Sequence, residues 1–594
     1  MSTLLWVLTG VLLYSVVAVF LDRRGILPNS FNVSGPALTI HTTRGRQFLT
    51  QLARPKRAWR ALANIGVGMA LVTMIGTFFL LVIQSISIIN SPPTESILRN
   101  PQNALVIPGV NEFLPLSVAP EIVFGLLVGM VVHEGGHGLL CRVEDINIES
   151  MGVFFVALLP IGAFVQPDEE SASEANRGAQ TRMFAAGVLN NIIVTLLVFA
   201  LLFGPIGSAI AVAPGGGVGD VSAGSTAEFA GIEQGDRILA VDGESVDSSG
   251  HLESLLADVD SEAVSIELAD GRTVTVEPAA YVSGISPDSP FAGEAGLNST
   301  DTITAVDGTA VTNEREIKQA AANDSVVELT YTDSQTDEER TIAGPLGVLA
   351  TVASDGPLAA AGAPTGEPIV ITEIGGERLV DFDDMTAVLE DRDPGETVDI
   401  VATVDGEETT YSVELDSHPD DDDRAFVGIT GSLGMSGITI NSVGIMPYPA
   451  ENFLSMLTGT AGDNLAATLL LLIVLPFIAM IDPAMEFNFA GFVEANAGFY
   501  EVVGPLAGLG EGGVFLLANL LFWTGWVNFN LALFNCIPAF PLDGGHILRS
   551  ATESIVSRLP IDSKPQLTRA ITTSVGLIML VSLLLMFLGP RLLA

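Results

Sequence analysis

The chain has 594 residues, which is too long for one hydrophobic core, so several domains are expected. A mean hydropathy of +0.48 with 48% apolar residues excludes an ordinary soluble protein and predicts an integral membrane protein. The 69 Asp and Glu against 25 Lys and Arg, only three of them lysines, suit a surface hydrated in concentrated salt, which favours a halophilic archaeon as the source and excludes nucleic acid as a partner.

Apolar blocks of about the 20 residues that a membrane helix needs recur along the chain. The loop after the first block is rich in arginine, which by the positive-inside rule places it in the cytoplasm and the amino terminus outside. Residues 1–120 are therefore predicted to form N-terminal membrane helices with a basic cytoplasmic loop. The candidate spans are residues 3–21, 62–90, 121–141, 183–212, 464–481, 513–536 and 571–589.

The third block contains the segment HEGGH, with His133 and His137 four residues apart. On a helix this spacing puts both imidazoles on one face, where they can hold a metal ion together. Glu134 lies beside them, and a carboxylate there can take a proton from a metal-bound water. The alternative is a pair of capping or core histidines, but ionisable side chains within a membrane span are costly and usually functional.

The fourth block contains Asn190 and Asn191. An amide within a membrane span can bond to a neighbouring helix or to a ligand, so we expect one of the two to support the metal site. Residues 121–212 are predicted to be one half of a catalytic membrane region. This block runs outward, which places the following insert outside the cell.

The insert is acidic, because 47 of the acidic residues lie between Pro214 and Gly431. Alternating apolar and polar residues predict folded strands there rather than a disordered tail. The stretch VSAGSTAEFAGIEQGDRILAVDGESV from Val221 is echoed from Ile285 and, more weakly, from Val352. These copies resemble PDZ domains of the protease-associated kind, which implies peptide carboxyl termini as partners. The predicted PDZ-like domains are residues 215–280, 281–344 and, in divergent form, 345–431.

Residues 432–512 are predicted to be connecting amphipathic and re-entrant segments. Pro476, Asp482 and Pro483 interrupt the fifth apolar block. Irregular backbone at membrane depth is tolerated only where protein buries it, so we expect a broken helical pair packed against the helical core. If this pair returns to the outside, the sixth block runs inward like the third, and the two blocks end at the same depth.

The sixth block ends in NCIPAFPLDGGH. A catalytic zinc needs a third protein ligand besides two histidines, and Asp543 can complete such a set because Gly544 and Gly545 permit close backbone approach. His546 is the alternative third ligand, since imidazole is the commoner ligand of zinc. An indirect supporting role is the other interpretation of His546.

HEGGH and PLDGGH, in separate membrane helices with PDZ-like copies between them, resemble the site-2 protease family of intramembrane zinc metalloproteases, peptidase family M50. The resemblance covers about residues 121–212 and 513–590. It implies that Zn²⁺ is bound by His133, His137 and Asp543, and that Glu134 is the catalytic acid and base.

The resemblance extends to the stretch GVFFVALLPIGAFVQPDEE, which is similar to the family's membrane-re-entering β-loop that receives the substrate strand. It also implies that Asn535 holds the substrate backbone, for which a helix-packing amide is the alternative. The predicted substrate-binding residues are Asn535, Pro538, Pro541, Asn190 and Asn191.

The predicted fold is a polytopic α-helical membrane protein of about six to eight spans, with a site-2 protease core, whose second half is residues 513–594, and an extracellular α+β insert. The predicted function is zinc-dependent hydrolysis of peptide bonds in or near transmembrane segments of other proteins in the cell membrane bilayer. Membrane-tethered transcription regulators are the natural substrates of the family. The alternatives are a membrane-anchored PDZ scaffold or receptor with a structural metal site, and a zinc-dependent transporter, for which ionisable residues on the other spans are scarce.

Overall fold

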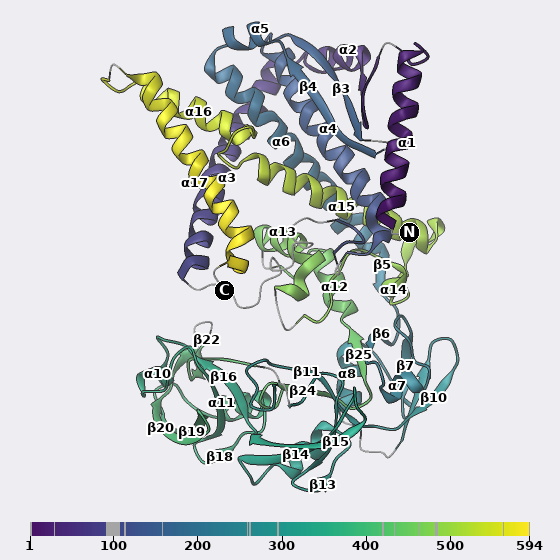
Figure 1. Cartoon of the computed structure of the whole chain (residues 1–594), viewed down its shortest axis with the longest axis vertical. Coiled ribbons are helices and arrows are strands. Elements are labelled where there is room, and N and C mark those ends of the chain that lie inside the picture. Colours follow the sequence, from purple (N-terminus) through teal and green to yellow (C-terminus); the bar gives the residue numbers. More distant parts are fainter. Residues whose placement is uncertain are drawn as a thin grey trace. The chain divides into compact units, whose positions relative to one another are not determined.

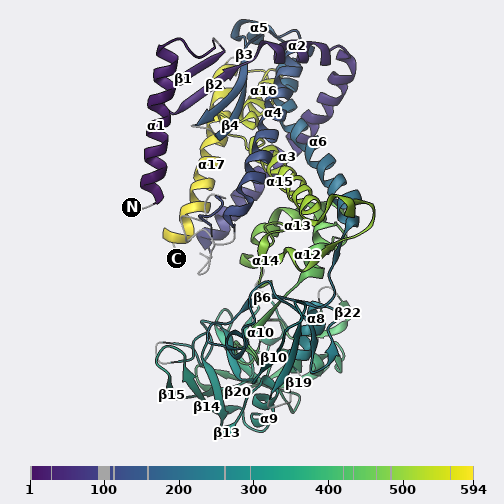
Figure 2. The ribbon, with the colours of Figure 1, turned by 90° about the vertical axis from the view of Figure 1, so that its right-hand side faces the viewer.

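Two units of different character make up the chain in the computed structural model, one mainly helical and one mainly of strands (Figures 1 and 2). The first comprises Met1–Ala211, Phe453–Val493 and Val502–Ala594, and the second Val212–Asn452 and Glu494–Glu501. Asp482 and Pro483, two of the predicted interruptions of the fifth block, lie outside the described residues. The structure describes residues 3–592 apart from 29, 91–106, 112–113, 157–158, 258, 260–262, 294–295, 419–420, 433, 463, 482–484 and 562.

Within the described part of the first unit, five helices are long and apolar enough to cross a membrane. They coincide with five of the predicted blocks. These helices are α3 (Lys56–Asn90), α4 (Ala119–Val143), α6 (Arg177–Leu201), α15 (Glu511–Asn535) and α17 (Lys564–Leu592). Other helices of this unit are α1 (Thr3–Arg23), α2 (Thr43–Leu52), α5 (Glu169–Glu174), α13 (Leu465–Val474) and α16 (Asp543–Val556). Helix α1 coincides with the first predicted block.

Local sequence explains where the helices around the site begin. Helix α6 starts after Asn176, whose side-chain oxygen accepts a hydrogen bond from the Ala179 N–H at 3.0 Å. Helix α4 has a proline in its first turn, where a missing N–H costs nothing. Helix α2 starts after Thr42, which caps the Gly45 N–H at 3.1 Å.

Helices α4, α6 and α15 pack against one another and form the core of the first unit. Glycines on α4 bring the backbones close, because a Cβ at Gly125 would lie 2.8 Å from Trp523 O and one at Gly129 would lie 2.7 Å from Leu531 Cδ1. The contacts advance in the same direction along both helices. Helices α4 and α15 are therefore parallel, which confirms the expected common direction of the third and sixth blocks.

A four-stranded antiparallel sheet packs against α4 through its edge strand. Two of its strands form the predicted β-loop, and the other two come from the basic region before α2, where no strands were predicted. The sheet order is β1 (Phe31–Ser34), β2 (Ala37–His41), β3 (Ile148–Val156) and β4 (Leu159–Pro167).

The fifth apolar block is a short helix followed by irregular backbone. Helix α13 passes into a 3-10 segment, Leu475–Met480, in which Phe477 is not helical. The backbone beyond it is bonded to α15: Asn519 accepts from Phe492 N–H at 2.8 Å and donates to Phe492 O at 2.9 Å, and Trp523 Nε1 donates to Ala490 O at 3.0 Å. Within the block itself, Ile473 O accepts a hydrogen bond from Trp526 Nε1 of α15 at 2.9 Å. The interrupted block thus packs against the helical core, as expected of irregular backbone in an apolar region.

The second unit contains three six-stranded sheets with the same strand order. The first module has β10 (Thr273–Val276), β9 (Val264–Leu268), β7 (Arg237–Val241), β6 (Gly216–Val221) and β25 (Ile445–Tyr448) in that order, with β8 (Glu244–Ser245) beside β7. The second has β15 (Glu338–Pro345), β14 (Val326–Asp333), β12 (Thr302–Val306), β11 (Ala280–Ile285) and β24 (Ile438–Asn441), with β13 (Thr309–Ala310) beside β12. The third has β20 (Glu407–Glu414), β19 (Thr397–Val404), β17 (Pro368–Ile374), β16 (Val348–Val352) and β23 (Ile429–Gly431), with β18 (Glu377–Arg378) beside β17.

The remaining elements of this unit are short. The helices are α7 (Thr226–Phe229) and α8 (Ser249–Ala257) in the first module, α9 (Glu314–Ala320) in the second, α10 (Pro357–Ala360) and α11 (Phe382–Glu390) in the third, and α14 (Glu494–Ala497). A pair of strands, β21 (Asp416–His418) and β22 (Asp421–Phe426), precedes β23. At the boundaries of the units lie β5 (Ile210–Val212), α12 (Ala450–Leu457) and β26 (Tyr500–Val502).

The three modules are nested rather than consecutive. The last strand of each sheet returns in reverse order, because β23 closes the third module, β24 the second and β25 the first. Each module has a hydrophobic core of its own, and residues after Gly431 belong to two of them: Met435 and Ile438 to the second, Val443 and Ile445 to the first. The predicted boundaries of 215–280 and 281–344 therefore omit a strand each, and part of the predicted connecting region 432–512 is strand.

Candidate metal centre

His133 and His137 lie one turn apart on α4 and direct their rings to one point. Their Nε2 atoms are 3.2 Å apart, and the ring planes are nearly perpendicular. Asp543, the first residue of α16, brings Oδ2 to 3.1 Å from His133 Nε2 and 3.2 Å from His137 Nε2. All three residues are buried, with at most 9% of the surface of each exposed. The structure thus brings the three predicted metal ligands together.

Coordination of a metal ion explains the positions of the two Nε2 atoms and Asp543 Oδ2 better than hydrogen bonds among them. The Asp543 Oδ2 atom is buried, yet neither imidazole meets it with the geometry of a hydrogen bond. A tetrahedral zinc with bonds of about 2.0–2.1 Å holds neighbouring ligand atoms about 3.3 Å apart, close to the distances found. Two imidazoles and one carboxylate are also a usual donor set of catalytic zinc. These residues would therefore hold a zinc ion and leave one position open.

The other ring nitrogen of each histidine meets helix α6. His137 Nδ1 lies 2.8 Å from the carbonyl oxygen of Met183, an acceptor that fixes the proton on Nδ1 and leaves Nε2 for a metal. His133 Nδ1 lies 3.3 Å from Asn191 Nδ2, while the buried Asn191 Oδ1 has no partner among the described residues. If the Asn191 amide is rotated by 180°, Oδ1 accepts a hydrogen bond from the Nδ1–H of His133. His133 then has the same tautomer as His137, with Nε2 available for a metal.

Of the two predicted asparagines, only Asn191 contacts a histidine of the site. Asn190 Nδ2 instead makes a long contact of 3.4 Å with the Val132 carbonyl. Gly187, one turn earlier on α6, was not predicted, although a Cβ there would lie 2.7 Å from both His133 Cε1 and His137 Nε2. A glycine is required there because the imidazoles pack directly on the backbone of α6.

The turn before Asp543 is packed without room for side chains on the two glycines that follow. A Cβ at Gly544 would lie 2.4 Å from Ile537 O, and one at Gly545 would lie 2.8 Å from the Ala539 carbonyl carbon. This explains the Gly-Gly pair by close backbone approach. Of the predicted substrate residues in this stretch, Pro538 is buried, Pro541 is exposed, and the half-buried Asn535 donates Nδ2 to Leu531 O of its own helix at 2.9 Å.

Glu134 is half-buried beside the two histidines and is held by strand β4. Its Oε2 accepts a hydrogen bond from the Val165 N–H at 2.8 Å. No other hydrogen bond to this carboxylate occurs among the described residues, so Oε1 is free to meet a water molecule. The edge of the sheet therefore lies directly at the carboxylate next to the metal ligands.

His546, the alternative third ligand, lies away from the convergence point. Its ring stacks on Phe184 with centroids 4.2 Å apart and meets Phe540 edge-on at 4.9 Å. The cluster of possible metal ligands in the described chain contains Asp543 and not His546. Burial lowers the pKa of His546 and Asp543 partly offsets this, so the ring is neutral at pH 7.

A stripe of buried polar side chains and glycines runs from the metal centre along the interface of α4, α6 and α15, and of its members sequence reasoning found only His133 and Asn191. Oxygen atoms of Glu121, Thr524 and Asn528 are buried there without a partner among the described residues. The sequence does contain a signal for this stripe, because polar or small residues recur every four residues on each of the three helices. The residues of the stripe are Glu121, Gly125, Gly129 and His133 on α4, Asn191 and Thr195 on α6, and Thr524 and Asn528 on α15.

Comparison with known proteins agrees with this centre. A protein of Mesorhizobium japonicum, named as a candidate zinc metalloprotease, is 29% identical over 201 residues, covering 27% of this chain and 54% of that protein. A similarly named protein of Agrobacterium fabrum is 31% identical over 173 residues, covering 23% and 45%. A protein of Methanocaldococcus jannaschii without an assigned function is 49% identical over 43 residues, or 7% and 12%.

This chain spans about half the length of the curated relatives it matches. The match to a family is broader. The model described as peptidase family M50 covers residues 121–583, from the first turn of α4 into α17, and so includes both segments that form the metal centre. The chain therefore belongs to peptidase family M50.

Proposed function

We propose that this protein is an intramembrane zinc metalloprotease that hydrolyses peptide bonds in or near the transmembrane segments of other membrane proteins. The convergence of His133, His137 and Asp543 among helices of membrane length carries the proposal. A bound zinc ion would supply Lewis acidity for the scissile carbonyl and the attacking water. The remaining chemistry falls to side chains that the chain itself positions.

Glu134 is the proposed acid and base. Its Oε1 atom would take the proton of the attacking water and then deliver it to the leaving amine, while Val165 N–H holds Oε2. This hydrogen bond fixes the carboxylate without using both of its oxygens. A merely structural metal site would need no carboxylate in this position, which favours the enzyme over the scaffold.

Strand β4 is the proposed docking edge for the substrate. It pairs with β3 on one side, and its other side carries the Val165 N–H that meets Glu134. Outward-pointing backbone groups alternate along an antiparallel strand, so Ala163 directs its N–H and carbonyl to the same side. An unwound substrate strand bonded there would lie alongside Glu134.

Substitution of Glu134 by Gln tests the proposal. The full chain would be purified in detergent and incubated with a co-purified membrane protein substrate, and the fragments would be detected by mass spectrometry. We expect cleavage to fall by at least about 100-fold while the zinc content is unchanged, because loss of the proton carrier removes about that factor. Glu149→Gln, the same change at an exposed position of β3, is the matched control.

Undiminished cleavage by Glu134→Gln protein would refute the enzymatic role of this carboxylate. No cleavage by either protein, together with stoichiometric zinc, would favour the membrane-anchored scaffold. We further propose that the strand modules lie outside the cell and bind peptide carboxyl termini, and that membrane-tethered transcription regulators are substrates. The position of β25, β24 and β23 at the end of their sheets supports peptide binding by strand addition.

A further inference from the structure

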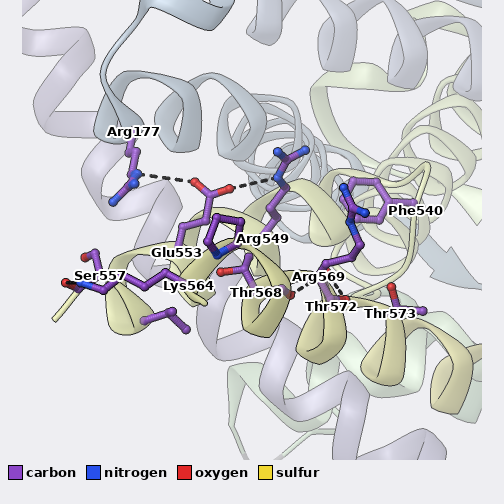
Figure 3. Close-up of a pocket in the computed structure, with 12 residues that line it drawn as sticks. Arg177, Phe540, Arg549, Glu553, Ser557, Lys564, Thr568, Arg569, Thr572 and Thr573 are labelled. Atoms are coloured by element: carbon purple, nitrogen blue, oxygen red, sulfur yellow. Dashed lines mark hydrogen bonds and ion pairs between the residues drawn. The ribbon is translucent and has the colours of Figure 1, made fainter. Parts of the chain in front are cut away.

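A basic pocket of about 470 Å³ lies beside the amino end of α17 (Figure 3), and none of the three metal ligands lines it. Its walls come from α16 and α17, with Arg177 at the start of α6 and Phe540 from the turn before α16. Helix α17 is one of the five helices of membrane length. The pocket therefore lies at the amino end of a helix that is long and apolar enough to cross a membrane.

Positive charge dominates the pocket of a strongly acidic chain. Arg177, Arg549, Lys564 and Arg569 line it, whereas Glu553 is its one acidic lining residue. The whole chain has only 25 Lys and Arg and a net charge of −44. The positive-inside rule accounts for basic residues near this end of α17, but it does not account for their gathering around one hollow.

The existing partners leave much of this charge without a counter-ion. Glu553 lies between two arginines, with Oε2 3.4 Å from Arg177 Nε and Oε1 3.1 Å from Arg549 Nε (Figure 3). Lys564 Nζ donates to the main-chain carbonyl of Ser557 at 2.8 Å. The Arg569 guanidinium has no hydrogen bond or ion pair within the described chain. Two cations thus face the pocket with no acidic partner.

The first turn of α17 also favours the binding of an anion. It contains no acidic residue, and Lys564 stands there although the amino end of a helix already carries partial positive charge. Thr568, Thr572 and Thr573, which carry hydroxyl groups, also line the pocket. Arginine, lysine, hydroxyl and free backbone N–H groups together are the donors that bind phosphate oxygens.

A second hollow of about 400 Å³ adjoins the first and shares Pro565, Arg569 and Thr573 with it. Further along α17, apolar side chains such as Leu577 and Leu580 are more than half exposed. A ligand with a phosphate headgroup and acyl chains could thus place the phosphate among the cations and its chains along this helix. A free phosphate would use the cations alone.

We propose that this pocket binds the phosphate headgroup of an anionic phospholipid. The bound lipid would hold α16 against α17, since Arg549 and Glu553 belong to α16 and Arg569 to α17. Helix α16 begins with Asp543, whereas the lipid would contact residues nearer its carboxyl end. By fixing the position of α16, the bound lipid would also fix the position of this metal ligand. This consequence for hydrolysis rests on the function proposed above, whereas the binding does not.

The test measures lipid affinity on delipidated full-length protein that carries Glu134→Gln, so that the outcome is independent of peptide cleavage. Dioctanoyl phosphatidylglycerol is the probe, titrated by thermophoresis at one fixed ionic strength because salt screens these charges. We expect Arg569→Gln and Arg549→Gln each to weaken binding roughly five-fold, the factor for one cation near a lipid phosphate. Arg569→Lys keeps the charge and should restore most of the affinity.

Arg558→Gln is the matched control, because Arg558 is exposed on the same basic segment but does not line the pocket. We expect its affinity to stay within about two-fold of the parent protein. An equal loss in Arg558→Gln would overturn the proposal in favour of general charge attraction. Equal binding of dioctanoyl phosphatidylcholine, or competition by inorganic phosphate at the concentration of the lipid, would overturn the anionic lipid as ligand.

Discussion

At the scale of single residues, the metal centre depends on a glycine that touches no metal. Gly187 lets both imidazoles pack on the backbone of α6. Gly187→Ala would push a methyl group against His133 and His137, whose rings also contact Met183 and Asn191 of the same helix α6. We expect zinc affinity to fall at least about ten-fold, since supporting contacts of metal ligands are commonly worth that much.

The measurement for Gly187→Ala is zinc retention during competition with a chelator, followed by elemental analysis. Gly76→Ala on α3 is the control, because a Cβ at Gly76 meets nothing within 4 Å. Equal zinc retention in the two variants would show that α6 yields easily and that the close packing is unimportant.

Asn191 offers a second test at this scale, because its buried Oδ1 lacks a partner while His133 Nδ1 lies next to the amide. Asn191→Leu removes the acceptor and should lower zinc affinity by about 10–100-fold. Asn191→Asp keeps an acceptor oxygen and should retain more zinc than the leucine variant in the same chelator competition. The reverse order would mean that the amide donates to His133 instead.

At the scale of helices and strands, the sequence predicted most of what forms the metal centre. The four-residue spacing of His133 and His137 is a local property of a helix, and the direction of the sixth block brought Asp543 to the same depth. The packing partners of these residues could not be predicted, because Gly187 and Met183 meet the imidazoles across a helix interface. Only the three-dimensional arrangement selects Asn191 over Asn190.

Short strands were the main gap in the prediction of the fold. Strands β23, β24 and β25 have three or four residues each, too few to show an alternating pattern, and their partners lie far back in the chain. Strands β1 and β2 were missed for the same reason within a basic segment. Strands β1 and β2 pair with each other as a hairpin, whereas pairing across long sequence separations places β2, β23, β24 and β25 beside their other partners, which no local signal identifies.

One carboxylate ties three helices together at the cytoplasmic end predicted for α4. Glu144 follows α4 and accepts hydrogen bonds from Arg60 on α3 at 3.1 Å and Arg182 on α6 at 2.8 Å. Burial raises the pKa of Glu144, but the hydrogen bonds and charges of Arg182 and Arg60 outweigh burial and lower it below the ordinary value. The ionised carboxylate therefore stabilises the folded state.

The pH dependence of this contribution follows from the lowered pKa. It is fully present above the ordinary glutamate pKa of 4.5 and is lost as the pH falls below that value toward the pKa of the folded state. Glu144→Gln should therefore cost about 1.5–3 kcal/mol at pH 7 and progressively less below pH 4.5. Thermal unfolding of both proteins across this range checks the prediction, with exposed Glu149→Gln as the control. A difference that grows as the pH falls would contradict it.

At the scale of the whole molecule, nesting makes the strand modules depend on one another's connections. The chain must complete the third module before the last strand of the second, and the second before the last strand of the first. Two buried isoleucines show this dependence sharply, since Ile438 and Ile445 are seven residues apart but belong to the cores of different modules. A consecutive arrangement of domains would place both in one linker.

Identical substitutions at these two positions should therefore loosen different modules of the full-length protein. Ile445→Ala should speed hydrogen exchange in β6–β10, more than 160 residues earlier, and Ile438→Ala should do so in β11–β15. Each removes buried apolar volume at a cost of about 2–5 kcal/mol, which corresponds to faster exchange of the amides that open with that module. Mass spectrometry of exchanged peptides measures both regions in the same sample, so each variant serves as the control for the other. Faster exchange of the same module in both variants would refute the nested arrangement.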